Sequence, residues 1–208
     1  MAHCQYVPNI DESLMSAVKE ELARKEQLQQ KHYFYLNELQ NMARELPPKY
    51  QQRLPYELLS SLANSLLDGT VFEIVRGLKE IQLMKEKHLY EKRMKIINSH
   101  RGMKDNLQKK HKEILSTHSQ DSPQILTTLR SSHEKELQEI EKRQTEEEGR
   151  VDMKIIIDLD QAVSDQQVTL EKAGVPGFFV TNNSNEIRLQ MYLLEFILKL
   201  RSVELPND

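Results

Sequence analysis

Residues 114–129 read ILSTHSQDSPQILTTL, a polar interruption between two long stretches of helical character. Ser122 followed by Pro123 is typical of an N-cap and a first helical residue, so a new helix begins here. The stretches on either side, about 71–118 and 123–172, contain no internal proline. Two long helices joined by about four residues must run antiparallel. The sequence therefore predicts a long helical hairpin.

The charges of the two stretches support this pairing. Residues 76–118 carry 12 Lys or Arg and 5 Asp or Glu, whereas residues 134–172 carry 6 and 12. A basic helix beside an acidic one selects its register through edge charges, as in coiled coils. Exposed ion pairs each contribute only about 0.2–1 kcal/mol, so they specify the pairing more than they stabilise it.

Apolar residues are concentrated at one end of this hairpin. Residues 54–97 and 151–205 contain most of them, and residues 98–150 are mainly polar. We predict one all-α domain over 1–208, in which 54–97 and 151–205 form a base with shorter helices and 98–150 form a projecting polar stalk. The hairpin is expected to be coiled-coil-like.

A further helix is predicted over residues 11–45. From Leu14 to Leu46, alternating steps of four and three residues meet an apolar or aromatic side chain at seven of ten positions, which is a heptad pattern. Pro47-Pro48 ends it. We expect this N-terminal segment, 1–46, to dock on the base or on another chain, and a homodimer through it is one expectation.

Local signals predict the remaining helix ends. Capping boxes are predicted at Asn9 with Glu12, at Thr70 with Glu73 and at Asn183 with Glu186, and a short helix is predicted over 55–67. Three glycines are predicted at helix ends or turns: Gly69, Gly174 and Gly177. Two more, Gly77 and Gly102, allow a bend within the long helix predicted over 71–118.

Composition excludes several classes of protein. Only 6 of 208 residues are Gly, and 38% are hydrophobic, which argues against Gly-rich phosphate-binding loops and turn-dense β-sandwiches. The single cysteine, Cys4, excludes an intramolecular disulfide. No apolar run is long enough to span a membrane, and residues 1–30 lack a secretory signal pattern. We expect a soluble intracellular protein in the nucleus, the cytoplasm or both.

No constellation of residues predicts catalysis. His100, His111 and His118 are too widely spaced for a helical zinc site, and Asp158 and Asp160 point to different sides of a helix. No nucleophile motif surrounds any serine. We therefore predict no enzyme activity and no catalytic, metal, cofactor or small-molecule site.

Partner-binding residues are predicted on apolar faces. Phe178 and Phe179 lie in a Gly-flanked loop, where they form either a lid on the base or an exposed docking site. The other candidates come from the two amphipathic terminal helices: Leu28, Tyr35, Leu39, Tyr192 and Phe196.

A basic cluster supports an alternative function. Residues 92–112 could contact phosphates of nucleic acid or chromatin, although no aromatic residue interleaves for base stacking. The acidic arm is expected to neutralise this cluster, so nucleic acid is the less favoured partner. The candidate phosphate-contacting residues within it are Arg101, Lys104, Lys109, Lys110 and Lys112.

Two segments resemble a known family. They read QQRLPYELLSSLA (51–63) with LLDGTVFEIV (66–75), and DQQVTLEKAGVPGFFVT (165–181) with LQMYLL (189–194). Together they resemble the gonadal and DiGeorge-syndrome-critical-region proteins, in register over about 45–115 and 150–200.

This resemblance implies a role in development, gonadal expression or neural-crest cell migration, in the nucleus or cytoplasm, and it implies no catalytic residues. The leading hypothesis is a non-enzymatic scaffold or adaptor that binds helical or coiled-coil proteins.

Overall fold

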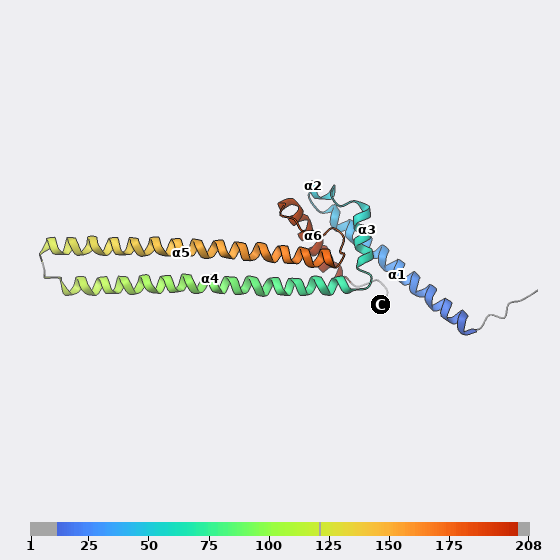
Figure 1. The fold of residues 1–208 in the computed structure, drawn as a ribbon, viewed down its shortest axis with the longest axis horizontal. Helices are drawn as coiled ribbons and strands as arrows, with labels where there is room; N and C mark the ends of the chain where they lie inside the picture. The colour runs from blue at the N-terminus through green and yellow to red at the C-terminus, as the bar shows by residue number, and fades with distance from the viewer. Residues whose placement is uncertain (1–11, 121, 204–208) are drawn as a thin grey trace, which may run out of the picture. The chain divides into compact units, whose positions relative to one another are not determined.

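The computed structural model describes residues 12–120 and 122–203. Within these ranges the chain forms helices and no strand, which confirms the all-α prediction. Figure 1 shows the helices in chain order: α1 (Glu12–Arg44), α2 (Pro48–Gln51), α3 (Tyr56–Ser65), α4 (Thr70–Thr117), α5 (Pro123–Lys172) and α6 (Ser184–Arg201).

The chain divides into two compact units. The core unit comprises residues 1–78 and 166–208, of which 12–78 and 166–203 are described. It contains α1, α2, α3 and α6 with the adjoining ends of α4 and α5. The hairpin unit comprises residues 79–165, the remaining parts of α4 and α5. The stalk boundaries at 98 and 150 stay predictions.

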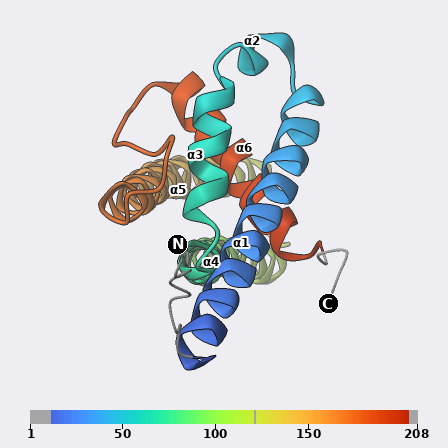
Figure 2. The same cartoon turned by 90° about the vertical axis from the view of Figure 1, so that its right-hand side faces the viewer.

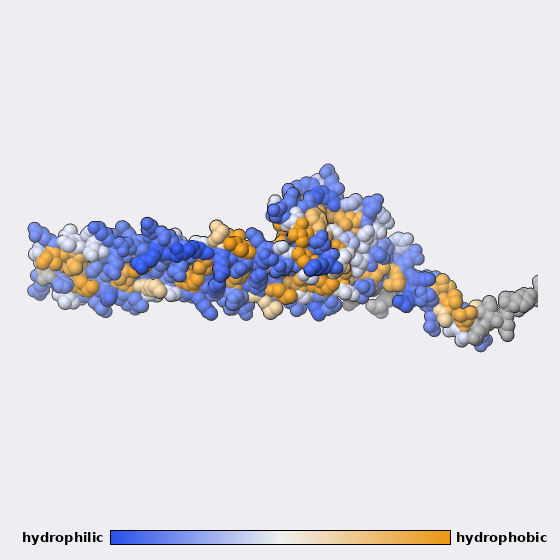
Figure 3. Space-filling model, viewed as in Figure 1, coloured by the Kyte–Doolittle hydropathy of each residue, from blue (hydrophilic) through white to orange (hydrophobic). Residues whose placement is uncertain are grey.

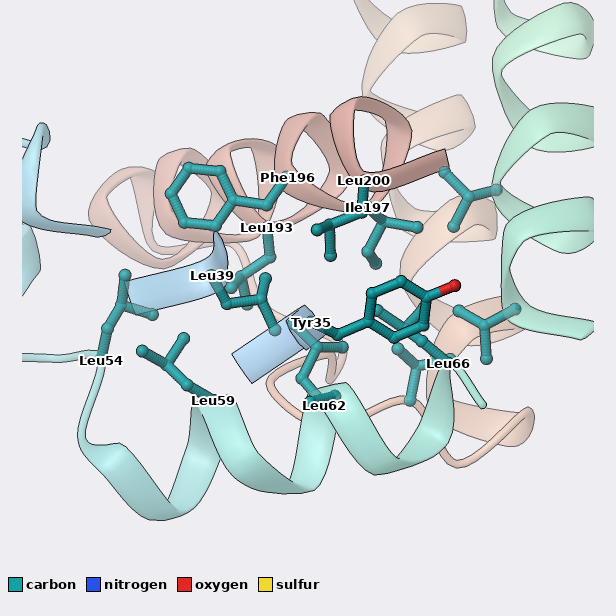
Figure 4. Packing of buried hydrophobic residues seen from close by; sticks show 14 of the residues in the cluster. Tyr35, Leu39, Leu54, Leu59, Leu62, Leu66, Leu193, Phe196, Ile197 and Leu200 are labelled. Carbon is teal, nitrogen blue, oxygen red and sulfur yellow. The ribbon is translucent and has the colours of Figure 1, made fainter. Parts of the chain in front are cut away.

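The hydrophobic core of the core unit forms where the second half of α1 packs against α3 and α6. Figure 2 shows α1 beside α3, and Figure 4 shows Tyr35 and Leu39 among the apolar side chains of α3 and α6. The side chains buried most completely come from several helices: Leu39, Leu62, Leu66, Val75, Leu170, Leu193, Ile197 and Leu200. Leucine and isoleucine thus supply most of the buried apolar surface.

Helix α2 is a feature that the sequence did not predict. It begins at Pro48, which suits a first helical residue because proline lacks the N–H that would be unpaired there. Gln51 at its end donates from Nε2 to the carbonyls of Arg44, 2.8 Å, and Leu46, 2.7 Å. These carbonyls follow the last turn of α1 and have no helical partner. Helix α2 therefore caps α1.

The predicted caps have mixed outcomes. Asn183 caps α6, because its Oδ1 accepts from the Asn185 N–H at 2.9 Å, while Glu186 pairs instead with Arg53. The capping box at Thr70 is wrong, since the N–H of Thr70 donates to Oδ1 of Asp68 at 2.9 Å. The predicted box at Asn9 begins outside the described residues.

The glycines predicted at helix ends have the backbone that such ends require. Gly69, Gly174 and Gly177 have φ values of 82°, 70° and 87°. Helix α4 continues through Gly77 and Gly102, and α5 continues through Gly149.

The hairpin unit pairs α4 and α5 in antiparallel fashion (Figure 1). Its contacts join residue 93 to 152, 104 to 141 and 111 to 136, so the register is constant. Buried or half-buried residues recur at steps of four, four and three. We call this set the contact face: Lys85, Leu89, Arg93, Ile96, His100, Lys104, Leu107 and His111 on α4, with His133, Leu137, Ile140, Gln144, Glu148, Val151, Ile155 and Leu159 on α5.

This spacing differs from the heptad of an ordinary coiled coil. Steps of four, four and three average about 3.67 residues per turn, close to the 3.6 of a straight helix. A heptad averages 3.5 and forces a left-handed supercoil. The 11-residue repeat of α4 and α5 instead favours a weaker supercoil of the opposite, right hand.

Candidate protein-interaction surfaces

One side of α1 is buried in its second half and exposed in its first. Tyr35 and Leu39 are 7% and 0% exposed, whereas Leu14 and Val18 are 59% and 50% exposed on the same side of the helix. Leu22 and Leu28 extend the exposed part, and Figure 3 shows apolar side chains at this end of α1. We call these four residues the α1 stripe. The core unit therefore buries or half-buries the heptad residues in the second half of α1 and leaves those in the first half exposed.

The structure separates the residues predicted on the terminal helices. Tyr35, Leu39 and Phe196 lie in the core of the chain itself, so a partner cannot reach them. Tyr192 is half-buried, and its ring lies 5.2 Å from that of Tyr50. Leu28 belongs to the exposed α1 stripe. Among these five residues, Leu28 is thus the one on an open surface.

The Gly-flanked loop also separates its two phenylalanines. Phe178 is buried in the core, while Phe179 is 43% exposed and Val180 is 51% exposed. Burial of Phe178 agrees with the lid interpretation, and the exposed Phe179 stays a candidate docking residue.

Two buried glutamines hold this loop. Gln167 on α5 donates from Nε2 to Oε1 of Gln190 on α6 at 3.0 Å, and its Oε1 accepts from the Thr181 N–H at 3.1 Å. Gln190 in turn donates to the carbonyl of Phe179 at 2.9 Å. The two amides thereby satisfy loop backbone groups and hold the backbone of the segment that carries the exposed Phe179.

Gly177 lets the loop approach α6 closely. A Cβ atom at this position would lie 2.7 Å from Leu193 Cδ1, and φ is +87°. Both the contact and the backbone exclude larger residues.

Half of the residues on the contact face of the hairpin unit are polar or charged. Arg93 donates to both carboxylate oxygens of Asp152, at 2.6 and 3.0 Å, which holds the pKa of Asp152 below its ordinary value. Lys104 pairs with Glu141, and Gln144 donates to the carbonyl of His100 at 3.0 Å. These contacts set the register of α4 against α5, because one helical turn of slip would break all of them.

His100 lies between two carboxylates of α5. Its Nδ1 is 2.8 Å from Glu148, its Nε2 is 3.2 Å from Glu147, and the residue is 6% exposed. The hydrogen bond to Glu148 raises the pKa of His100, with burial opposing it and Glu147 assisting. Both ring nitrogens can donate only in the protonated form, so this environment favours imidazolium.

His111 and His133 form the opposite environment. Their rings stack at 3.8 Å with an interplanar angle of 3°, and His111 Nε2 lies 2.8 Å from Glu136. Both Nδ1 atoms are buried and have no hydrogen-bond partner among the described residues. Burial and the neighbouring His111 lower the pKa of His133 despite the attraction of Glu136. This pair favours a neutral His133.

We therefore predict opposite responses to acid along the hairpin unit. The raised pKa of His100 contributes stability that is full below the unfolded value of about 6.5 and is lost as the pH rises. The lowered pKa of His133 contributes stability that is full above about 6.5 and is lost as the pH falls. Between about pH 7.5 and 5.5, amide exchange, corrected for intrinsic rates, should slow around His100 and accelerate around His111.

Single variants separate the two effects. His100→Gln should abolish the acid-induced slowing only, and His133→Gln should abolish the acceleration only. A wild-type chain in which both segments change in the same direction would contradict the assignment.

The predicted basic residues remain on the surface. Arg101, Lys109, Lys110 and Lys112 are exposed, and Lys104 pairs with Glu141. Neutralisation by the acidic arm is thus seen for Lys104.

Two tests on the described residues concern membranes and metals. No single helix there has the length and apolar composition to cross a membrane, and the pair α3 and α4 passes the same test only when joined across a 91° bend. No three His, Cys, Asp or Glu side chains in the described ranges are arranged to hold a metal ion.

Sequence reasoning missed the glutamine pair and the stacked histidines. A glutamine in a helical pattern is usually exposed, so Gln167 and Gln190 carried no signal. His100, Lys104, Leu107 and His111 are spaced by four, three and four residues. A search of the sequence for steps of four, four and three could therefore have placed His111 on the contact face.

The chain is similar to proteins of one family over nearly its full length. The family model described as DiGeorge syndrome critical region 6 (DGCR6) protein matches residues 13–207. "Protein DGCR6" of Gallus gallus is 50% identical over 180 residues, which cover 86% of this chain and 88% of that protein. "Gonadal protein gdl" of Drosophila melanogaster is 41% identical over 173 residues, covering 83% and 81%. No solved structure matches.

Proposed function

This chain belongs to the DiGeorge syndrome critical region 6 protein family, and we propose that it is a non-enzymatic scaffold that binds helical protein partners in a developmental setting. The names of the family and of the chicken and Drosophila relatives state no catalysed reaction. The name of the Drosophila relative refers to the gonad, which supports the developmental setting.

The α1 stripe is the observation that carries this proposal. Leu14, Val18 and Leu22 are at least half exposed and continue an apolar side that packs on α3 and α6 farther along α1. An amphipathic helix laid along this side would bury the exposed leucines as α3 and α6 bury Leu39. The scaffold would then hold its partner through an extension of its own core.

Replacing the α1 stripe tests the proposal. Leu14→Ser, Val18→Ser and Leu22→Ser together should reduce the recovery of partner proteins at least about tenfold, because apolar anchors contribute most of the binding free energy. Stability should change little, since all three side chains are exposed. Proximity labelling in cells, compared with the wild-type chain, measures the loss.

A matched control lies on the opposite side of the same segment. Glu20→Ser, Ala23→Ser and Gln27→Ser alter three exposed positions and should leave recovery unchanged. Equal losses in both variants, or full recovery with the stripe removed, would contradict the proposal.

The nucleic-acid alternative rests on the exposed Lys109, Lys110 and Lys112. Binding through phosphates would weaken steeply with salt, whereas binding through the α1 stripe would depend little on salt. A steep salt dependence, lost on replacing the three lysines with glutamate, would favour this alternative over the scaffold.

A further inference from the structure

The two long faces that flank the contact face of the hairpin unit differ in chemistry. Tyr90, Met94 and Ile97 on α4 each follow a contact-face residue by one position, and so does Ile156 on α5. One position is a rotation of about 100°. Because the helices are antiparallel, this step turns side chains of both helices to the same side of the hairpin. We call these four residues the apolar hairpin face.

This face is open to solvent. Tyr90 is 64% exposed and Ile156 is 53% exposed, while Met94 and Ile97 are half-buried. Tyr90 and Ile156 lie at the same level, because the adjacent Arg93 pairs with Asp152. Leu83 and Met153, 55% and 60% exposed, lie at its borders. The apolar side chains therefore form one patch across two helices.

The opposite face is charged. There, the residues that precede the contact face by one position include Lys92, Lys95, Lys110, Arg143, Glu147, Arg150, Lys154 and Asp158. Over residues 89–97 of α4 and 148–156 of α5, the hairpin thus has an apolar side and a charged side, and the charged side remains for solvent when the apolar hairpin face is covered.

The outer borders of the apolar hairpin face carry matched charges. Asp105 lies one position after Lys104, at the outer edge formed by α4, and Lys142 lies one position after its partner Glu141, at the outer edge formed by α5. Lys87 lies 18 residues before Asp105 on one edge, and Asp160 lies 18 residues after Lys142 on the other. Eighteen residues are five helical turns, so each pair stays on its own edge.

We propose that a second copy of this chain covers the apolar hairpin face, with the two hairpin tips pointing the same way. A two-fold axis along the hairpin puts each α4 over the α5 of the second copy. Tyr90 then meets Ile156 of the second copy. At the borders, Lys87 faces Asp160 of the second copy, and Asp105 faces Lys142 of the second copy.

The charges select this orientation over the reverse one. With the tips pointing in opposite directions, a two-fold axis would put each α4 over the α4 of the second copy and each α5 over its α5, so the basic helices would face each other and so would the acidic ones. At full overlap, the apolar half of one hairpin would also cover the polar half of the other. Like charges held together across an interface are unfavourable. The Arg93–Asp152 pair lies on the same face and enters the interface already paired.

Gly149 fits the same arrangement. It lies within α5, where glycine is less favourable than alanine, and no described atom of its own chain lies within 4 Å of a Cβ atom placed there. It follows Glu148 of the contact face by one position, at the level of Ile97. A second copy would bring its Ile97 over Gly149, where the missing side chain permits close approach.

Sedimentation equilibrium of the full chain tests the proposal. The wild-type chain should be a dimer, and Tyr90→Ser with Ile156→Ser should weaken dimerisation at least about tenfold. The matched control is Ile81→Ser with Met84→Ser, which removes apolar residues of similar exposure, 58% and 65%, from outside this face. Its dimer should match the wild type. A monomeric wild type, or equal weakening in both variants, would overturn the proposal.

A charge exchange gives a second measurement that does not remove apolar surface. Asp105→Lys should weaken the dimer, because the new lysine would face Lys142 of the second copy. Adding Lys142→Asp should restore the dimer. Because Asp105 and Lys142 of one chain lie on opposite edges, rescue cannot arise within a monomer. Absence of rescue would contradict the arrangement. Neither experiment alters α1, so their failure leaves the scaffold proposal to its own test.

Discussion

Leu39→Ala should lower the free energy of unfolding of the core unit by about 2–5 kcal/mol. Leu39 is 0% exposed and packs with α3 and α6, so truncation removes buried apolar contacts and leaves a cavity where three helices meet. Urea unfolding followed by tyrosine emission measures the change, since Tyr35, Tyr50 and Tyr192 all lie in this unit.

Leu22→Ala on the same helix is the matched control. Leu22 is 55% exposed, so the identical substitution should change stability by less than about 0.5 kcal/mol. It should instead weaken partner binding if the α1 stripe is the docking surface. Equal destabilisation by the two variants would show that the first half of α1 is also covered by its own chain.

Gln190→Ala should cost the core unit about 1–3 kcal/mol. The substitution leaves the buried side-chain amide of Gln167 and the partly buried carbonyl of Phe179 without this partner. The same urea titration measures the loss, and limited proteolysis should find the 178–183 segment cleaved faster, because one of its anchors is gone.

Gln167→Ala completes a double-mutant cycle. Gln167 is hydrogen-bonded to both Gln190 and the Thr181 N–H. The losses of unfolding free energy in the two single variants should therefore add up to more than the loss in the double variant. Gln166→Ala, one residue earlier on α5 and outside this hydrogen-bond chain, is the control. Additive losses would mean that the two amides act independently.

The hairpin was predictable because its signals are local. Ser122 and Pro123 identify a helix start from two adjacent residues, and the short connection then dictates antiparallel helices. The start of α6 and its cap at Asn183 follow from equally short-range chemistry. Where one helical turn contains the cause, the sequence alone was sufficient.

Other features depend on contacts between distant residues. The heptad pattern of α1 indicates an apolar side, and it cannot say whether the chain itself or a partner covers each part, so Tyr35 and Leu39 were assigned to a partner. The roles of Gln167 and Gln190 require the loop to be placed between α5 and α6. Charged residues on the contact face, such as Arg93 and Glu148, concealed its spacing.

The spacing of the contact face makes hairpin length a modular quantity. Steps of four, four and three return to the same side of the helix after 11 residues, which advance about 16 Å. Removing or adding one such block in both α4 and α5 would preserve the facing side chains, whereas other block sizes would rotate them apart. The hairpin unit can therefore become longer or shorter in steps of 11 residues per helix without any change to the residues of its contact face.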